Sequence, residues 1–222
     1  MIKEIEMNHP RLLMNEANCG GSKIKHMIKA VGFDADGMVV QGQRFSDRLA
    51  KDFGIPQESI QAFFTNEFQL CLIGKADLKI ALAPYIDQWG WQGSVDSLLD
   101  YWFSDESQVN QEIVNAIAKL RHKGIKCYLL TNQEKYRTEY FANQLDFATI
   151  FDEMFSSAAI GYKKPQPEFF EAISKQIAPI RKNEVLFWDD ELKNVNAAKQ
   201  FGFQAKHYAN LANFKKVVAL SA

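Results

Sequence analysis

Short apolar segments alternate with amphipathic stretches along most of the chain from residue 29 onward. Largely apolar segments predict strands, which we place at 30–33, 125–130, 151–155, 185–188 and 203–207. The stretches between the later strands carry apolar residues at helical spacing, and they predict helices. Regular strand–helix alternation predicts an α/β fold, a Rossmann-like parallel sheet covered by helices on both faces.

The predicted helices of this alternating part are each defined by a face or an end signal. Val109, Ile113, Val114, Ile117 and Leu120 share one helical face, and Gly124 follows as a stop. Three further helices are predicted, at 134–145, 167–177 and 192–201.

One long helical block interrupts this pattern immediately after the first strand. Residues 42–105 are helical in period and rich in aromatic residues, including three of the four tryptophans. Pro84 is expected to kink or shorten one of the helices. We therefore predict an α-helical cap inserted into the α/β core.

Domain boundaries follow from these patterns. The core is predicted at 27–41 and 106–222, and the cap at 42–105. Residues 1–26 show no clean period and too short an apolar run for a secretory signal, so they are expected to form a mobile N-terminal extension.

Composition narrows the class of partners. The 222 residues include 26 Lys and Arg against 27 Asp and Glu, a formal net charge of -1. A strong basic excess is typical of nucleic-acid-binding proteins, so we expect no nucleic acid partner. The longest apolar run is four residues, which excludes a membrane-spanning helix. Three scattered cysteines without a C-x-x-C motif favour a cytoplasmic location and no disulfide framework or zinc site.

Polar side chains gather where the predicted strands end, which is where ligands bind in open α/β sheets. These residues are Asp34 and Asp36 after the first strand, Thr131 and Asn132 after the second, Lys164 in a later loop, and Asp189 and Asp190 after the strand at 185. Each motif alone is weak, because aspartates are favoured helix caps and Lys-Lys-Pro is usually a solvated turn. Their conjunction at one sheet edge is the signal.

Charge predicts the chemistry of this edge. Carboxylates from separate strands repel one another unless a hard cation lies among them, and Mg²⁺ suits oxygen ligands and substrate phosphate. One of these carboxylates can then attack phosphorus to give an aspartyl-phosphate. Asp36 can protonate the leaving group and later deprotonate water. Side chains of Thr131, Asn132 and Lys164 can hold the phosphoryl oxygens.

At these residues the sequence resembles the haloacid dehalogenase superfamily, in its phosphatase-like branch with a helical cap after the first strand. The resemblance covers about residues 27–210. It rests on four motifs, which are Phe33-Asp34-Ala35-Asp36-Gly37, Leu129-Leu130-Thr131-Asn132, the segment from Gly161 to Phe170 that contains Lys163-Lys164-Pro165, and Val185 to Asp190. Met38 departs from the Thr or Val usual after the glycine, a difference that concerns packing more than mechanism.

The resemblance implies a role for each matching residue. Asp34 would be nucleophile and metal ligand, and Asp36 the general acid/base with its backbone carbonyl on the metal. Thr131 and Lys164 would bind phosphate with Asn132 beside them. Asp190 would bind Mg²⁺ directly, with Asp189 sharing that role or supporting it.

Function follows as a hypothesis with alternatives. We expect a Mg²⁺-dependent phosphatase acting on a small phosphorylated metabolite, without a membrane partner. A 2-haloacid dehalogenase is disfavoured because dehalogenases of this family lack the second aspartate, since a halide leaving group needs no proton. A phosphomutase with the same core and a non-catalytic binding domain remain alternatives, and the oligomeric state is not predicted.

Overall fold

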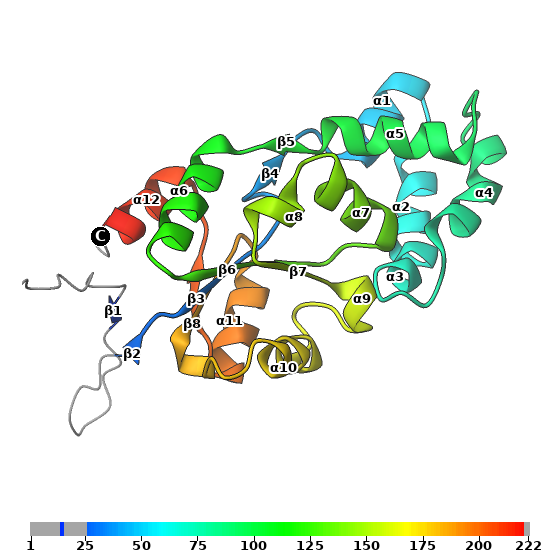
Figure 1. The fold of residues 1–222 in the computed structure, drawn as a ribbon. Helices are drawn as coiled ribbons and strands as arrows, with labels where there is room; N and C mark the ends of the chain where they lie inside the picture. Colours follow the sequence, from blue (N-terminus) through cyan, green and yellow to red (C-terminus); the bar gives the residue numbers. More distant parts are fainter. Residues whose placement is uncertain (1–13, 16–25, 220–222) are drawn as a thin grey trace, which may run out of the picture.

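Five parallel strands form the central sheet of the protein, in the order β7-β6-β3-β8-β9. The computed structural model describes residues 14–15 and 26–219 (Figure 1). The strands are β3 (Ala30–Phe33), β6 (Lys126–Thr131), β7 (Glu153–Ser156), β8 (Val185–Asp189) and β9 (Gln204–His207). The order places β3 in the middle, so the residues that follow it are flanked on both sides by other strand ends.

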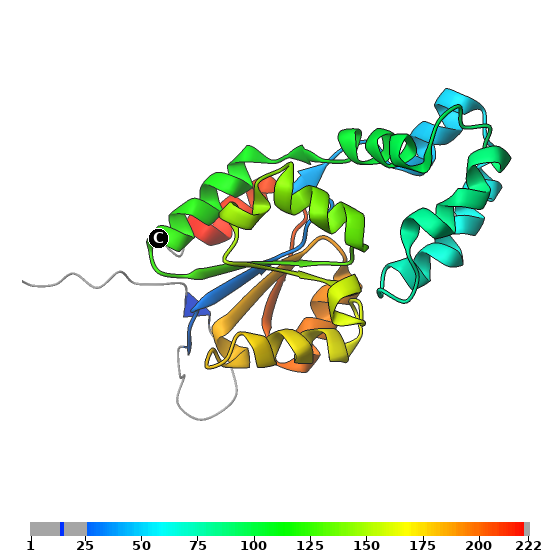
Figure 2. The ribbon, with the colours of Figure 1, turned by 45° about the vertical axis from the view of Figure 1, so that its right-hand side comes forward.

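Helices cover both faces of this sheet (Figure 2). One face packs against α6 (Gln111–His122), α7 (Lys135–Asn143), α8 (Phe147–Ile150) and α12 (Leu211–Ala219), and the other against α10 (Pro167–Gln176) and α11 (Leu192–Phe201). Alternation along β6 explains the two layers, since Cys127 and Leu129 join the first core and Tyr128 and Leu130 the second. The predicted α/β fold is confirmed.

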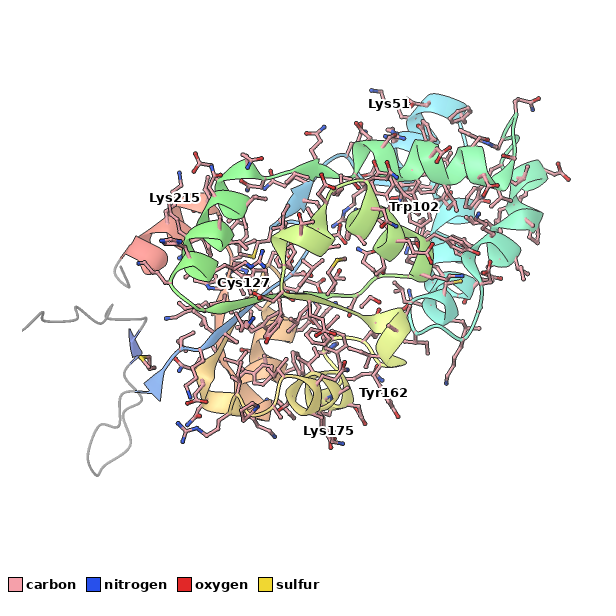
Figure 3. All side chains as sticks on the ribbon, viewed as in Figure 1. Lys51, Trp102, Cys127, Tyr162, Lys175 and Lys215 are labelled. Carbon is pink, nitrogen blue, oxygen red and sulfur yellow. The ribbon has the colours of Figure 1, made fainter. Side chains whose placement is uncertain are left out.

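The helices between β4 and β5 have a hydrophobic core of their own. They are α1 (Phe45–Phe53), α2 (Gln57–Thr65), α3 (Glu67–Cys71), α4 (Leu78–Gln88) and α5 (Val95–Asp105), which we refer to as the cap. Aromatic rings fill this core, and Phe45 stacks on Trp102 with 4.5 Å between ring centroids. Figure 3 shows Trp102 among the cap helices, away from the central sheet.

Two adjacent chain segments join the cap to the core. They form an antiparallel pair, β4 (Val40–Gln41) and β5 (Gln108–Val109). A Cβ at Gly42 would lie 2.0 Å from the carbonyl oxygen of Asp105, so the glycine allows the two segments to approach closely. Both ends of the cap therefore leave the core at one narrow neck.

The remaining elements are short. They are β1 (Met14–Asn15), β2 (His26–Met27), α9 (Ser157–Ile160) and the 3-10 turn η1 (Lys182–Glu184). Strand β1 pairs antiparallel with β2. The rest of the predicted N-terminal extension, 1–13 and 16–25, lies outside the described residues. Within the described part of the chain, no helix is both long and apolar enough to cross a membrane.

The helical assignment of Val109 is wrong. Of the two effects expected of Pro84, a shortened helix is wrong, and a kink stays a prediction. Val109 lies in β5 and not in a helix, because its pairing with Val40 overrides the helical spacing of the following residues. Pro84 does not shorten α4, which continues to Gln88. The proline deprives only the carbonyl of Ile80 of its helical partner, and Ile80 is exposed to solvent, where water can replace that bond.

Candidate active site

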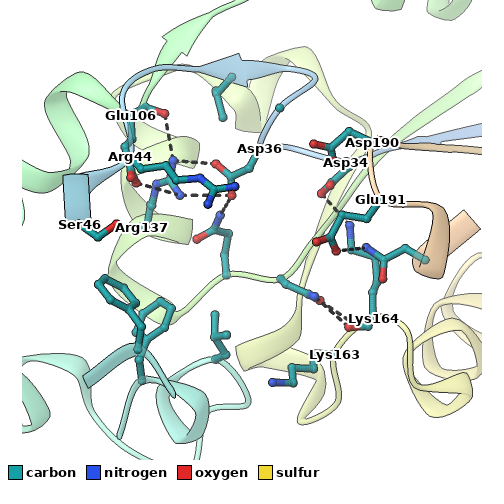
Figure 4. Close-up of a pocket in the computed structure, with 18 of the residues that line it drawn as sticks. Asp34, Asp36, Arg44, Ser46, Glu106, Arg137, Lys163, Lys164, Asp190 and Glu191 are labelled. Atoms are coloured by element: carbon teal, nitrogen blue, oxygen red, sulfur yellow. Dashed lines mark hydrogen bonds and ion pairs between the residues drawn. The ribbon is translucent and has the colours of Figure 1, made fainter. Parts of the chain in front are cut away.

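The carboxyl end of β3 lies at the floor of a cavity of about 900 Å³ (Figure 4). Phe33 is in register with Leu129 of β6 and Trp188 of β8, so Asp34 sits between the ends of two neighbouring strands. Its backbone N–H donates to the carbonyl of Trp188 at 2.9 Å. Parallel pairing thus brings together strand-end residues that are far apart in the sequence.

A buried ammonium group connects two of these carboxylates. Lys164 Nζ lies 2.6 Å from Asp34 Oδ1 and 2.7 Å from Asp189 Oδ2, and it also donates to the carbonyl of Leu130 at 2.8 Å. Burial acts to lower the pKa of Lys164, but the charges of Asp34 and Asp189 outweigh it and hold that pKa above its ordinary value. Lys164 therefore stays charged between the two carboxylates.

Asp34 is held on one oxygen and left open on the other. Its Oδ1 accepts hydrogen bonds from Lys164 and, at 2.7 Å, from the N–H of Ala35. No residue in the described part of the chain donates to Oδ2. Burial raises the pKa of Asp34 well above its ordinary value, Lys164 opposes this, and the charge of Asp189 adds to it. One ammonium does not balance the local carboxylates, which leaves room for a cation.

Asn132 fixes the loop that carries Lys164. Its Nδ2 donates to the carbonyl of Lys164 at 3.0 Å, and its Oδ1 accepts from the Lys164 N–H at 2.8 Å. Both ends of the side-chain amide are therefore engaged with the protein, although Asn132 also lines the cavity. The contacts visible here position Lys164.

Thr131 is placed less favourably for a substrate contact. Its side chain is fully buried and does not line the cavity. Its hydroxyl is a buried polar atom without a hydrogen-bond partner among the described residues. A buried hydroxyl without a partner is costly, so this group is available to a bound anion or water. Its predicted role in phosphate binding stays a prediction.

The residues present fit a magnesium ion. Carboxylate oxygens of Asp34, Asp189 and Asp190 all lie within 4.8 Å of one another. Opposite ligands of an octahedral Mg²⁺ are roughly 4 Å apart, given bonds of about 2.1 Å. Asp189 is fully buried and accepts from the Glu191 N–H at 2.8 Å and from Asn194 Nδ2 at 3.1 Å. These bonds and the pair with Lys164 make Asp189 the more constrained of the two consecutive aspartates.

A glycine makes room for Asp190. Gly37 has φ +73°, and a Cβ there would lie 2.2 Å from Asp190 Oδ2. The final glycine of the Asp-x-Asp-Gly motif is thus required twice, for its left-handed backbone and for the approach of a carboxylate. The sequence marked Gly37 only as part of a motif.

Asp36 lies apart from the three clustered carboxylates. Its oxygens contact Arg137 of α7, with Oδ1 2.8 Å from Nη2 and Oδ2 3.2 Å from Nη1, and Gln133 Nε2 donates to Oδ2 as well. Asp34 and Asp36 both line the cavity but are held by different groups (Figure 4). Its predicted metal contact, through the backbone carbonyl, stays a prediction.

Several residues around the site were not identified from the sequence. Gln133, Arg137 and Asn194 contact the predicted aspartates, and Glu106 contacts Arg137. Arg137 and Asn194 lie within helices, where a charged or polar residue is typical of a solvated face. Gln133 follows the Thr131-Asn132 motif directly, which is the one signal that could have found it.

The cap supplies the opposite wall of the cavity. Its contribution is mixed, with aromatic and apolar side chains beside amides and a hydroxyl. Between β4 and β5 the lining residues are Gly42, Arg44, Ser46, Gln61, Phe64, Phe68, Gln69, Leu72, Trp102 and Glu106. Lys163 Nζ also donates a hydrogen bond to Gln69 Oε1, and Tyr136 OH donates to Asp77 Oδ2 at 2.6 Å, so core and cap touch at residues outside the neck as well.

Comparison with curated proteins identifies two phosphatases among the relatives. The D-ribitol-5-phosphate phosphatase of Bacteroides thetaiotaomicron is 24% identical over 202 residues, which covers 86% of this chain and 96% of that protein. A sesquiterpene phosphatase of Aspergillus oryzae is 32% identical over 95 residues. That match covers 43% of this chain, and the chain spans about half, 48%, of that relative.

Solved structures share the fold. A haloacid dehalogenase family enzyme from Bacteroides thetaiotaomicron, in complex with magnesium and inorganic phosphate, superposes with a TM-score of 0.71 at 20% identity, covering 84% of this chain and 98% of that one. The L-2-haloacid dehalogenase of Xanthobacter autotrophicus gives 0.62 at 23% identity, covering 87% and 83%. The family model described as haloacid dehalogenase-like hydrolase matches residues 28–202. The chain therefore belongs to the haloacid dehalogenase-like hydrolases.

Proposed function

We propose that this protein is a Mg²⁺-dependent phosphatase that hydrolyses a small phosphorylated metabolite through an aspartyl-phosphate on Asp34. The observation that carries the proposal is the asymmetric environment of Asp34. One carboxylate oxygen is fixed by Lys164 and the Ala35 N–H, while the other accepts no hydrogen bond from the described residues. A nucleophile needs such a fixed orientation with one oxygen available to the substrate.

The metal would be held by Asp34 and Asp190 with the backbone carbonyl of Asp36, and Asp189 would share that role or support it. When bound, Mg²⁺ neutralises the carboxylates and the negative charge of the phosphoryl group. The three clustered carboxylates and the single ammonium of Lys164 support this assignment. Lys164, Thr131 and Asn132 are proposed to bind the phosphoryl oxygens, with Asn132 acting mainly by holding Lys164 in place.

The proposed reaction has two steps. Asp34 attacks phosphorus, an O–P bond forms, the ester P–O bond breaks, and the leaving oxygen takes a proton from Asp36. A water then attacks the same phosphorus and gives a proton to Asp36. The P–O bond to Asp34 breaks, which releases inorganic phosphate and restores both aspartates. Asp36 is suited to both transfers because it lines the same cavity as Asp34.

The relatives support a phosphatase, and Asp36 disfavours a dehalogenase. Two curated relatives are phosphatases, and a structure of similar fold was solved with magnesium and inorganic phosphate. Release of halide requires no proton donor, whereas release of an alkoxide does. An Asp36 that is held in place by Arg137 and Gln133 is therefore more useful to a phosphatase.

Phosphate release from a panel of phosphorylated metabolites tests this proposal. We expect turnover that EDTA abolishes and added Mg²⁺ restores. Release of halide from 2-chloropropionate without any phosphatase activity would support the dehalogenase instead. Transfer of phosphate within a sugar phosphate would indicate a phosphomutase, and inactivity in all three assays would favour a binding domain.

A further inference from the structure

Arg137 and Gln133 bind the carboxylate of Asp36, which is otherwise exposed to the cavity. Arg137 contacts both of its oxygens, at 2.8 and 3.2 Å, and Gln133 donates to one of them. The side chain of Asp36 is 50% exposed, but that of Arg137 is only 7% exposed. A group that faces the cavity is thus oriented by a partner that is enclosed in the protein (Figure 4).

Arg137 is itself fixed by the core. It lies in the first turn of α7, where its backbone N–H donates to the carboxylate of Glu134. Its guanidinium carbon lies 4.9 Å from the centroid of the Phe141 ring. A planar guanidinium that contacts both oxygens of a carboxylate allows little rotation of either group. The position of α7 therefore sets the orientation of Asp36.

The same guanidinium reaches the neck of the cap. Arg137 Nη2 donates to the carbonyl of Glu106 at 3.0 Å, and Nη1 lies 3.8 Å from Glu106 Oε2. The Glu106 carboxylate in turn accepts from Trp102 Nε1 at 2.7 Å and from the Phe45 N–H. Glu106 thus binds the first residue of α1 and the last turn of α5, which are the two ends of the cap.

We propose that Arg137 is a positioning residue, which holds Asp36 in the orientation for proton transfer and links that orientation to the cap through Glu106. The inference rests on the proposed phosphatase function. Each carboxylate oxygen has two lone-pair sites, so contact with Arg137 leaves Asp36 able to exchange a proton toward the cavity. Arg137 does not contact Asp34, Lys164 or the clustered carboxylates through any hydrogen bond found among the described residues.

The proton transfers distinguish this role from a purely structural one. Attack by Asp34 on p-nitrophenyl phosphate releases a stable phenolate, so the first step needs little help from Asp36. An alkyl phosphate needs the proton in the first step, and both substrates need Asp36 as a base in the second. Loss of Arg137 should therefore spare one step for one substrate, whereas general damage to the site would slow every step.

Rapid-mixing kinetics with Mg²⁺ and p-nitrophenyl phosphate tests the inference in the full-length chain. For Arg137→Lys and Arg137→Met we expect a first turnover near the wild-type rate, followed by steady-state turnover slower by about 10–100-fold. With ethyl phosphate the first turnover should slow as well. Asp36→Asn should show the same pattern, with a larger effect.

Arg48→Lys is the matched control. Arg48 is also buried, lies over the Tyr101 ring at 3.7 Å and pairs with Asp105 at 3.0 Å, beside Glu106, but it does not touch Asp36. This variant should lower the melting temperature and leave the ratio of first to later turnovers unchanged. Arg137→Lys keeps the charge, so it provides a folded variant if Arg137→Met does not fold.

Failure of the proposed function and failure of the proposed role of Arg137 give different results. A wild-type protein that turns over neither substrate contradicts the proposed function. An active wild type whose folded Arg137 variants keep full activity, or lose both turnovers equally with both substrates, overturns the role of Arg137 alone.

Discussion

The two halves of the site differ in how the protein holds them. Asp34, Lys164 and Asp189 belong to the core and are buried, and Lys164 Nζ lies 2.6 Å from Asp34 and 2.7 Å from Asp189. Asp36 is half exposed, and its partner Arg137 contacts the neck of the cap. In the proposed mechanism, the half that carries the nucleophile, Asp34, lies within the core, whereas the acid/base half, Asp36 with Arg137, contacts the neck of the cap.

This difference assigns distinct tasks to the two halves. A buried cluster of paired charges is suited to stabilising charge, because a low-dielectric surrounding strengthens each electrostatic contact. A half-exposed carboxylate is suited to exchanging protons with a leaving group and with water. Changes in the first half should reduce the rate with every substrate, and changes in the second should depend on the substrate.

Removal of the nucleophile has the largest expected effect. Asp34→Asn should reduce turnover of p-nitrophenyl phosphate by at least about 10⁴-fold, because the amide cannot form the covalent intermediate. Lys164 still pairs with Asp189, so circular dichroism should show a folded protein. Asp96→Asn, at an exposed ion pair of the cap, is the control and should retain activity. A folded Asp34→Asn protein with unchanged turnover would contradict the assignment.

Crowding of Asp190 should weaken metal binding. Gly37→Ala places a methyl group 2.2 Å from Asp190 Oδ2, so the Mg²⁺ concentration for half-maximal activity should rise by about 10–100-fold. Gly54→Ala is a matched control, because Gly54 also has positive φ (+67°) but no atom within 4 Å of the added Cβ. That variant should lose about 1–2 kcal/mol of stability and keep the wild-type Mg²⁺ dependence. An equal Mg²⁺ dependence of Gly37→Ala and Gly54→Ala would contradict a metal-binding role for Asp190.

Loss of the hydrogen bonds that fix the Lys164 loop should reduce turnover of aryl and alkyl phosphates to the same extent. Asn132→Ala removes two hydrogen bonds to the backbone of Lys164, at 2.8 and 3.0 Å. We expect kcat to fall by about 10-fold or more for aryl and alkyl phosphates alike, since each lost bond is worth about 1 kcal/mol. A loss confined to alkyl phosphates would place Asn132 in the acid/base half.

Loosening of the cap should have a small effect. Tyr136→Phe deletes the hydrogen bond from core to cap at Asp77, which is 2.6 Å long. A single net hydrogen bond of about 1 kcal/mol predicts a change in KM of roughly 5-fold and little change in kcat for p-nitrophenyl phosphate. A fall in kcat for p-nitrophenyl phosphate without a change in KM would contradict this expectation.

Glu134, at the N-terminus of α7, should make the stability of the protein depend on pH. Burial raises the pKa of Glu134 to about 7, although hydrogen bonds from the N–H groups of Arg137 and Tyr136 oppose the shift. The folded state therefore binds a proton more tightly than the unfolded state, whose pKa is near 4.5. This contribution to stability is present below about pH 4.5 and is lost as the pH rises to about 7. In Glu134→Gln the denaturation midpoint should depend less on pH over that range than in the wild type. A pH dependence equal to that of the wild type would contradict the effect of burial on Glu134.

The sequence predicted the nucleophile half better than the acid/base half. Asp34, Asn132 and Asp190 each follow an apolar strand directly, and parallel pairing makes such residues neighbours. Arg137 and Glu106 lie in a helix and at a neck, where nothing local distinguishes them from solvated charges. Their contacts depend on how α7 packs beside the cap, which is a tertiary property.

The elements of the fold also differ in how well the sequence predicts them. The core strands were predicted within a few residues because each is a short apolar segment of the sheet. Val109 was assigned to a helix, because a two-residue strand has no periodicity of its own and forms only when β4 lies beside it. The cap was predicted as helical from its spacing, but which of its aromatic residues line the cavity could not be.

The most direct test is to locate the phosphoryl group on the protein. Asp36→Asn, mixed with Mg²⁺ and p-nitrophenyl phosphate and quenched in acid, should accumulate an aspartyl-phosphate because its second step is slow. Peptide mass spectrometry should find the phosphate on Asp34 and no label in the matching Asp34→Asn, Asp36→Asn double variant. Phosphate on another residue, or turnover of the substrate by a protein that is never labelled, would contradict the covalent role of Asp34.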